Sequence, residues 1–265
     1  MIVANTQTLR GPEYAPTPLS ITGVPVVPFD TYDHVLEYIE ETIESNRKSF
    51  CVAINPIKIY NAWHTRELWD LLRQTDVNIC DGVGVSIASR ILNGRGVKRI
   101  TGCDLFFRLL QLASKKNWGV YLLGASTESN AAARSGLKRM YPNLRIVGWQ
   151  DGYFEDSTKV VEQINASGAD LLFVAMGSPK QEYWIWRHRQ SINSKFCMGV
   201  GGSFDVASGN IKRAPKFFRA TGTEFLFRFV MEPRKRLSNQ KILFYFLLRI
   251  IGRKLFGIGT SVEWA

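Results

Sequence analysis

The chain has 265 residues, of which 45% are hydrophobic and 12% aromatic, so it can bury a substantial core and is not intrinsically disordered. Its net charge is +11, and ten of these charges come from residues 212–254, where 12 Lys and Arg stand against two Glu. Such a segment predicts an anionic partner: a phospholipid surface, a nucleic acid or a diphosphate-bearing substrate. We expect the charge to form one basic surface.

Apolar segments and helical segments alternate along most of the chain. Residues 1–20 contain three prolines and are expected to form an irregular leader. The predicted elements that follow are an extended segment (21–29), an amphipathic helix (32–45), a buried strand (50–54), a helix (62–74), a short strand (77–80), two helices (84–92 and 103–117), a strand (119–124) and a helix (130–140).

The alternation continues to the end of the predicted domain. Its last elements are an extended segment (144–154), a helix (158–166), a strand (169–176), a helix (179–190) and a strand leading into a glycine-rich loop (196–205). Strands that alternate with helices predict an α/β fold, a Rossmann-like and mostly parallel sheet flanked by helices. We expect this catalytic domain at 21–211, followed by a basic, amphipathic helical appendage at 212–265.

The appendage contains seven consecutive apolar residues, 242–248, whereas a membrane-spanning helix needs about 20. On a helix its cations lie within about 220° of arc beside rows of apolar residues, which is typical of a helix at a membrane interface. The alternative is a core helix with a basic edge. The residues expected to contact the membrane are Lys241, Phe244, Phe246, Leu247, Arg249, Ile250, Arg253 and Lys254.

Cysteine and histidine spacing favours neither disulfides nor a metal site. The four cysteines are far apart and form no CxxC pair, and the three histidines form no HExxH or HxH pattern. No secretory signal is evident at the start of the sequence. We therefore expect free thiols in a reducing compartment and no metal bound by protein side chains.

Polar residues or glycines follow five predicted strands, at the edge where parallel sheets bind ligands. Asp81 follows one of these strands, and its carboxylate is a candidate general base or a partner for a ligand hydroxyl. The alternative role for Asp81 is to cap the next helix. In RITGCDLF, Arg99 is a candidate for binding a diphosphate or for orienting a carboxylate, and Asp104 is expected to cap a helix.

Two further loops are candidates for ligand contact. In AMGSPKQEYW, Pro179 is expected at the first helical position, Lys180 beside an anion, and Gln181 against a uracil or a sugar. Glu182 is expected to support the helix dipole. The loop that contains Gly201 lacks the GK[ST] ending of a P-loop, and no GxSxG nucleophile elbow occurs, so covalent hydrolase chemistry is not expected.

Eight segments, in order, resemble the bacterial glycosyltransferase family typified by the N-acetylmannosaminyltransferases of enterobacterial common antigen and wall teichoic acid synthesis. The resemblance covers about residues 22–237. The segments are NPIKIYNA, DGVGV, RITGCDLF, VYLLGAS, GYF, AMGSPKQEYWI, GVGGSFDVASGNIKRAP and TEFLFRFVMEPRKR.

This resemblance implies an inverting transfer of a sugar from a UDP-sugar to a saccharide carried on undecaprenyl diphosphate, with no metal or other cofactor. By the same resemblance Asp81 is the general base, and the appendage closes over the site with arginines that stabilise the leaving diphosphate. The residues expected to bind substrate are Asn55, Arg99, Thr101, Gly102, Gly124, Gly177, Lys180, Gln181, Gly201, Arg228, Arg234 and Lys235.

The chain departs from the family pattern at three positions. Ala53 stands where many relatives have threonine, Lys235 where they usually have arginine, and Ser238 where a further arginine is common. Lysine keeps the charge and loses the two-pronged hydrogen bonding of arginine. The donor therefore stays open among N-acetylmannosamine, its uronic acid, glucose and other hexoses.

A lipid-linked acceptor predicts a peripheral protein at the cytoplasmic face of the inner membrane, attracted to anionic lipids, and an oligomer is compatible with the sequence. One alternative is a non-catalytic, membrane-associated subunit of a polysaccharide assembly complex. The other is a nucleic-acid-binding protein, which pI 9.6 would fit, but no RNP, KH or zinc-finger motif occurs and we expect no nucleic-acid partner.

Overall fold

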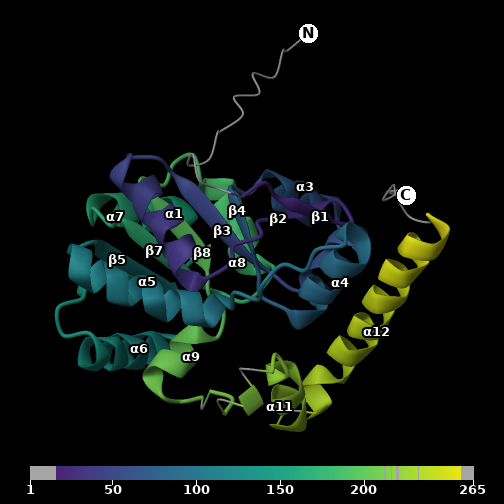
Figure 1. Ribbon diagram of the computed structural model, residues 1–265. Helices are drawn as coiled ribbons and strands as arrows, with labels where there is room; N and C mark the ends of the chain where they lie inside the picture. The colour runs from purple at the N-terminus through teal and green to yellow at the C-terminus, as the bar shows by residue number, and fades with distance from the viewer. Residues whose placement is uncertain (1–15, 212, 216, 219–220, 232, 258–265) are drawn as a thin grey trace.

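The computed structural model describes residues 16–257 apart from positions 212, 216, 219–220 and 232, and leaves out the side chains at 225, 226, 228, 234–236, 238 and 239. At its centre is a six-stranded sheet in the order β4-β3-β8-β7-β5-β6, with every neighbouring pair parallel (Figure 1). The predicted Rossmann-like α/β fold is thus confirmed. The strands are β3 (Ser49–Ile54), β4 (Val77–Cys80), β5 (Gly119–Gly124), β6 (Arg145–Gln150), β7 (Leu171–Ala175) and β8 (Phe196–Gly199).

A small antiparallel hairpin precedes the sheet. It consists of β1 (Leu19–Ile21) and β2 (Val24–Val26), so the predicted extended segment is in fact a hairpin whose first strand begins inside the expected leader. Most of that leader lies outside the described residues.

Helices connect the strands and cover both faces of the sheet. They are α1 (Tyr32–Glu44), α2 (Pro56–His64), α3 (Arg66–Gln74), α4 (Val83–Asn93), α5 (Gly102–Lys116), α6 (Thr127–Met140), α7 (Ser157–Ala166), α8 (Lys180–His188), α9 (Ser203–Ser208), α11 (Glu224–Met231) and α12 (Pro233–Phe256). The single helix predicted at 62–74 is wrong, because Thr65 has an extended backbone (φ −142°, ψ 105°) and separates α2 from α3. Helix α9 was predicted only as a loop.

Two apolar cores lie on opposite faces of the sheet, because side chains alternate along each buried strand. In β3, Phe50, Val52 and Ile54 belong to the core that includes α2, α3 and α8. Cys51 and Ala53 belong to the core that includes α1, α5 and α6. This arrangement explains why the strands are continuous apolar runs, and it holds the loops after the strands at one edge of the sheet.

Helix α12 packs against α2 and α4, on the side of the domain opposite α5 and α6 (Figure 1). Phe246 and Ile250 are fully buried in the first core, and the Phe246 ring stacks on Trp63 with centroids 5.6 Å apart. The prediction that these two residues contact a membrane is therefore wrong. On the side of α12 that carries them, the alternative prediction of a core helix holds. The exposed side of the helix carries Phe244, Tyr245, Leu248, Ile251, Leu255 and Phe256.

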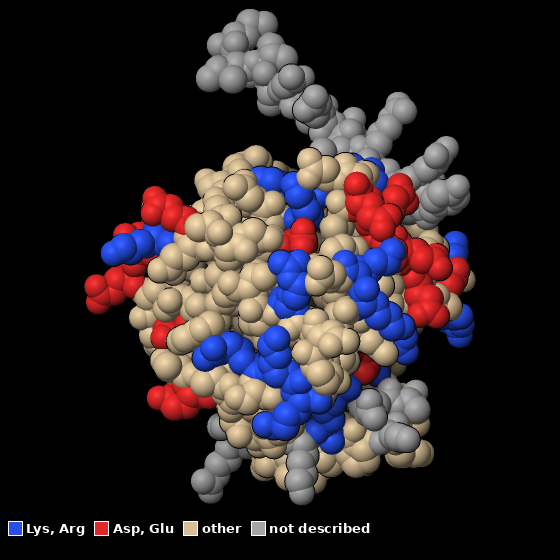
Figure 2. Space-filling view, turned by 90° about the vertical axis from the view of Figure 1, so that its left-hand side faces the viewer, with Lys and Arg blue, Asp and Glu red and all other residues tan. Residues whose placement is uncertain are grey.

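Basic side chains are not confined to the C-terminal segment. Figure 2 shows Lys and Arg gathered on the face that lies to the left in Figure 1, where α5 and α6 are found. Lys138 and Arg139 in α6 and Arg145 at the start of β6 are exposed. The protein therefore has basic side chains on a second surface besides the predicted one. The net charge does not reveal this second group, because acidic residues elsewhere balance it.

Candidate active site

The ends of β3 and β4 place two predicted site residues side by side. Ile54 pairs with Cys80 at the ends of the two parallel strands, and the next residue in each chain segment is Asn55 or Asp81. The backbone N–H of Asp81 donates to the Ile54 carbonyl (2.8 Å), which extends the ladder by one residue. Asn55 caps α2, with its side-chain oxygen accepting from the Lys58 N–H at 2.9 Å.

The Asp81 carboxylate does not cap α4, the helix that follows it, and instead accepts from the first N–H of α5. Gly82 occupies the N-cap position of α4 with no side-chain cap, whereas Asp81 Oδ1 accepts a hydrogen bond from the Gly102 N–H at 3.1 Å. The capping alternative is therefore wrong, and the second carboxylate oxygen remains for other chemistry. Burial raises the pKa of Asp81, while the Gly102 N–H, Arg99 and Lys58 act to lower it. A carboxylate with a raised pKa is a stronger base.

The turn before α5 holds Gly102 in place through a local network. Thr101 caps the helix by accepting from the Asp104 N–H (3.1 Å), and its hydroxyl donates to Asp104 Oδ2 (2.8 Å). Thr101, and not Asp104 as predicted, is thus the capping residue. Arg213 donates to Asp104 Oδ1 at 2.7 Å, so the predicted appendage is tied to this turn.

Arg99 also joins the predicted appendage to the site. Its Nε donates to the Asp81 carbonyl (3.3 Å), and its Nη2 pairs with Glu224 Oε2 (3.2 Å) at the start of α11. The side chain expected to bind a diphosphate therefore has a carboxylate partner in this structure. An anionic substrate group would have to share this guanidinium with Glu224 or replace it.

A buried ion pair that the sequence analysis missed lies beneath the site. Lys58 Nζ donates to Glu182 Oε1 (2.8 Å) and to the Ala53 carbonyl (2.9 Å), and the two side chains are 5% and 1% exposed. Glu182 thus does more than support the α8 dipole, as was predicted. Burial acts to raise its pKa, but Lys58 and hydrogen bonds from Gln181 and Ser178 outweigh burial, and the pKa of Glu182 is lowered.

Gln181 connects this ion pair to the glycine loop after β8. Its Nε2 donates to Glu182 Oε1 (3.0 Å), and its Oε1 accepts from the Gly201 N–H (3.0 Å). The side chain is 4% exposed, and a Cβ added at Gly199 would lie 2.5 Å from its Nε2. The structure therefore shows Gln181 holding the loop, in addition to any contact it makes with a ligand.

Some of the remaining predicted residues lie along the same edge of the sheet, and the side chains of others are not described. Gly124 ends β5 with φ +113°, and a Cβ there would lie 2.5 Å from the Ala175 carbonyl oxygen. Gly177 follows β7, and exposed Lys180 begins α8 just after the cis Ser178–Pro179 bond, so Pro179 is not the first helical residue as predicted. The side chains of Arg228, Arg234 and Lys235, in α11 and α12, are not described.

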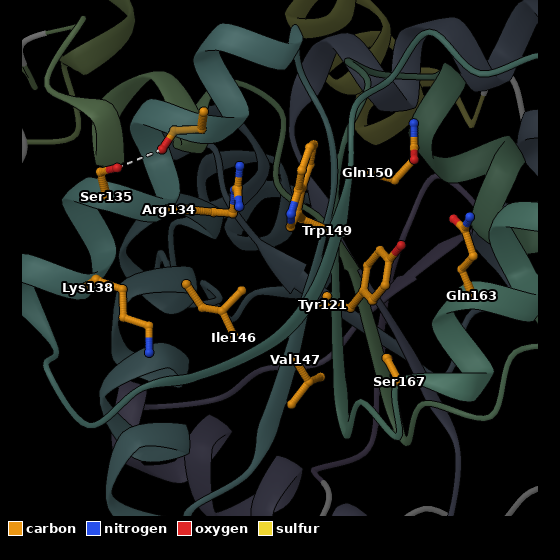
Figure 3. A pocket seen from close by; sticks show the side chains of 12 residues that line it. Tyr121, Arg134, Ser135, Lys138, Ile146, Val147, Trp149, Gln150, Gln163 and Ser167 are labelled. Atoms are coloured by element: carbon orange, nitrogen blue, oxygen red, sulfur yellow. Dashed lines mark hydrogen bonds between the residues drawn. The ribbon is translucent and has the colours of Figure 1, made fainter.

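A groove of about 900 Å3 lies elsewhere, around the edge strand β6. Figure 3 shows the side chains that line it. Arg134 and Lys138 from α6 lie on one side of the strand, and Tyr121 and Gln163 on the other. None of the predicted site residues lines it, so it is separate from the Asp81 site. Within the described part of the chain, no three His, Cys, Asp or Glu side chains are grouped to hold a metal ion.

Comparison with known proteins shows the family of the chain. Residues 19–258 match the model of the glycosyl transferase WecG/TagA/CpsF family. An N-acetylglucosaminyldiphosphoundecaprenol N-acetyl-beta-D-mannosaminyltransferase of Bacillus subtilis is 34% identical over 225 residues, which are 83% of this chain and 88% of the relative. A protein of the same name from Bacillus spizizenii is 36% identical over 210 residues, 78% of this chain and 82% of the relative. The chain therefore belongs to the WecG/TagA/CpsF glycosyltransferase family.

Proposed function

We propose that the protein transfers a sugar from a UDP-sugar to a saccharide carried on undecaprenyl diphosphate, with inversion at the anomeric carbon. Family membership supports glycosyl transfer, and the names of both Bacillus relatives specify an undecaprenyl-diphosphate-linked acceptor. The observation that carries the mechanism is Asp81, a half-buried residue whose carboxylate does not cap the helix that follows it and whose pKa is raised by burial.

In the proposed reaction, the acceptor hydroxyl oxygen attacks the anomeric carbon of the donor sugar. The hydroxyl proton passes to Asp81 Oδ2, because Oδ1 already accepts from Gly102. The bond between the anomeric carbon and the diphosphate oxygen breaks on the opposite face, and UDP leaves with the electron pair. General-base catalysis of this kind typically increases the rate by about 10²–10⁴-fold.

The leaving diphosphate needs positive charge in place as its bond breaks. Arg99 lies beside Asp81 and pairs with Glu224, the first residue of α11. Arg228 belongs to α11, and Arg234 and Lys235 belong to the first turn of α12. We assign these four cations to diphosphate stabilisation. Asn55, Thr101, Gly102, Gly124, Gly177, Lys180, Gln181 and Gly201 complete the proposed substrate-binding edge.

We further propose that α12 brings the site to the cytoplasmic face of the inner membrane. Leu237, Phe244, Leu248, Ile251 and Leu255 follow one another at spacings of three, four or seven residues, so they form one stripe on the helix, and each is at least 45% exposed. Lys241 and Lys254 are exposed on the same helix. No helix in the described residues is long and apolar enough to cross a bilayer. Shallow insertion of this stripe fits a peripheral protein.

A transfer assay tests the proposal. Radiolabelled UDP-N-acetylmannosamine, its uronic acid and UDP-glucose are each offered with a lipid-linked N-acetylglucosamine acceptor, to wild type and to Asp81→Asn. The asparagine keeps an oxygen for the Gly102 N–H, so the fold should be retained. We expect one donor to be used, with a loss of at least about 100-fold in the variant. Transfer by neither protein would favour the non-catalytic subunit, and equal transfer by both would exclude Asp81 as the base.

A further inference from the structure

A groove of about 460 Å3 lies between α2 and α12, away from the residues assigned to the transfer reaction. The side chains that form it come from one face of each helix, at spacings of three and four residues. They include Tyr60, Trp63 and His64 from α2, and Arg249, Gly252 and Arg253 from α12. The catalytic edge is at the other end of α2, where Asn55 caps the helix.

The groove carries two arginines, one of which has a fixed position. Arg249 and Arg253 are one helical turn apart, and the described residues that line the groove include no Asp or Glu. The Arg249 guanidinium lies over the Trp63 ring, 4.5 Å from its centroid, and Trp63 is itself 5% exposed and stacked on Phe246. A guanidinium held on an aromatic ring loses little freedom when it binds, and its donors match the oxygens of a phosphate.

Gly252 keeps the groove open. A Cβ at this position would meet no atom of the described residues within 4 Å. Glycine is a poor choice for a helix interior on grounds of propensity. A larger residue at this place would extend into the groove between Arg249 and Arg253.

The groove opens beside the apolar surface of α12. Tyr245 and Leu248 line it and are also 55% and 50% exposed, and Leu248 belongs to the stripe proposed to enter the membrane. A ligand that fits both features has an anionic head for the arginines and an apolar part that continues along the stripe. A soluble anion would use only the first feature.

We propose that this groove binds the phosphate head group of an anionic membrane phospholipid. The proposal rests on the part of the proposed function that places α12 at a membrane. It adds a defined head-group site to a surface that would otherwise bind by general charge attraction and apolar insertion. Attraction of that general kind depends on surface potential and does not distinguish one anion from another.

Vesicle binding separates the two modes. Phosphatidylcholine vesicles containing phosphatidylglycerol are compared with phosphatidylcholine vesicles containing oleate, matched in surface potential, and binding is measured by co-sedimentation. Wild type is expected to bind the phosphatidylglycerol vesicles at least about tenfold more tightly, the effect of one hydrogen bond to a charged group. Equal binding to both vesicle types would overturn the proposal.

Three variants identify the groove as the source of the preference. Gly252→Leu fills the groove while keeping every charge, and is expected to abolish the preference for phosphatidylglycerol. The double variant Arg249→Gln/Arg253→Gln is expected to do the same. Lys241→Gln/Lys254→Gln removes equal charge outside the groove, and should weaken binding to both vesicle types alike while keeping the preference. A preference retained by Gly252→Leu would show that the groove is not the site.

Two controls complete the test. Calorimetric titration with glycerol 1-phosphate is expected to show no binding at millimolar concentration, and binding there would assign the groove to a soluble phosphate ester instead. Transfer to a short-chain, detergent-soluble acceptor reports on the proposed function without a membrane. Active protein with no vesicle preference would refute the head-group site alone, and inactive protein with the preference would refute only the proposed reaction.

Discussion

Lys58→Met removes the cation that neutralises the buried Glu182 carboxylate. In the wild type Glu182 Oε1 accepts from both Lys58 and Gln181. Methionine has a similar length and fills most of the space, so the change is mainly one of charge. The variant leaves an uncompensated carboxylate that is 1% exposed.

The expected cost can be estimated from the burial of the pair. Removing one partner of a buried ion pair typically costs about 3–5 kcal/mol, a large share of the roughly 5–15 kcal/mol by which domains are stable. Replacing both partners with apolar residues is often neutral. We therefore expect Lys58→Met to lose about 3–5 kcal/mol of unfolding free energy, and Lys58→Met/Glu182→Met to recover at least about half of that loss.

Activity should not recover with stability. In the double variant Gln181 has lost its Glu182 acceptor. The Gln181 side chain, which accepts from the Gly201 N–H, is then no longer held in position by Glu182. Urea unfolding gives the stability of each variant, and the transfer assay gives kcat and KM for the donor. A single variant that costs less than about 1 kcal/mol, or a double variant with full activity, would refute this account of the ion pair.

Three further substitutions test other parts of the structure. Phe246→Ala should lower the free energy of unfolding by about 3–5 kcal/mol, because the ring is fully buried. Phe244→Ala, at a position 60% exposed, should change it by no more than about 0.5 kcal/mol and should weaken vesicle binding instead. Equal losses of stability in thermal unfolding would contradict the orientation of α12. Gly199→Ala should displace the Gln181 side chain and raise KM for the donor, and unchanged kinetics would contradict that contact. Asp81→Asn should raise the free energy of unfolding at pH 7, because burial raises the pKa of the folded carboxyl and so penalises its ionised form; this gain should vanish below about pH 3.9, where the unfolded chain is protonated as well.

The sequence predicts the sheet well, and it predicts the glycines and polar residues at the carboxyl ends of the strands, because both depend on local patterns. Buried runs such as 171–175 identify strands, and a glycine or polar residue after each run identifies the edge. The role of Asp81 was harder to predict, since aspartate before a helix usually caps it. The backbone N–H of Asp81 instead continues the pairing with β3, and its side chain turns toward Gly102.

Two of the errors arise where distant segments meet. Lys58 and Glu182 are 124 residues apart, and no local pattern connects them. A weak signal existed, since Lys58 is a charged residue inside an otherwise apolar stretch of α2. Periodicity correctly grouped Phe246 with Ile250 on α12, but it cannot show which row of a helix faces the protein, because the Trp63 ring that covers Phe246 comes from α2.

The pH dependence of kcat/KM for wild type and Asp81→Asn is the most direct test of the central claim. With Asp81 as general base, the wild-type rate should rise as the carboxyl ionises, with a midpoint above the ordinary aspartate pKa of about 3.9 because burial raises it. Asp81→Asn should be at least about 100-fold slower and lack this rise. An asparagine variant that keeps the wild-type acid limb would contradict the claim, because another group would then be accepting the proton.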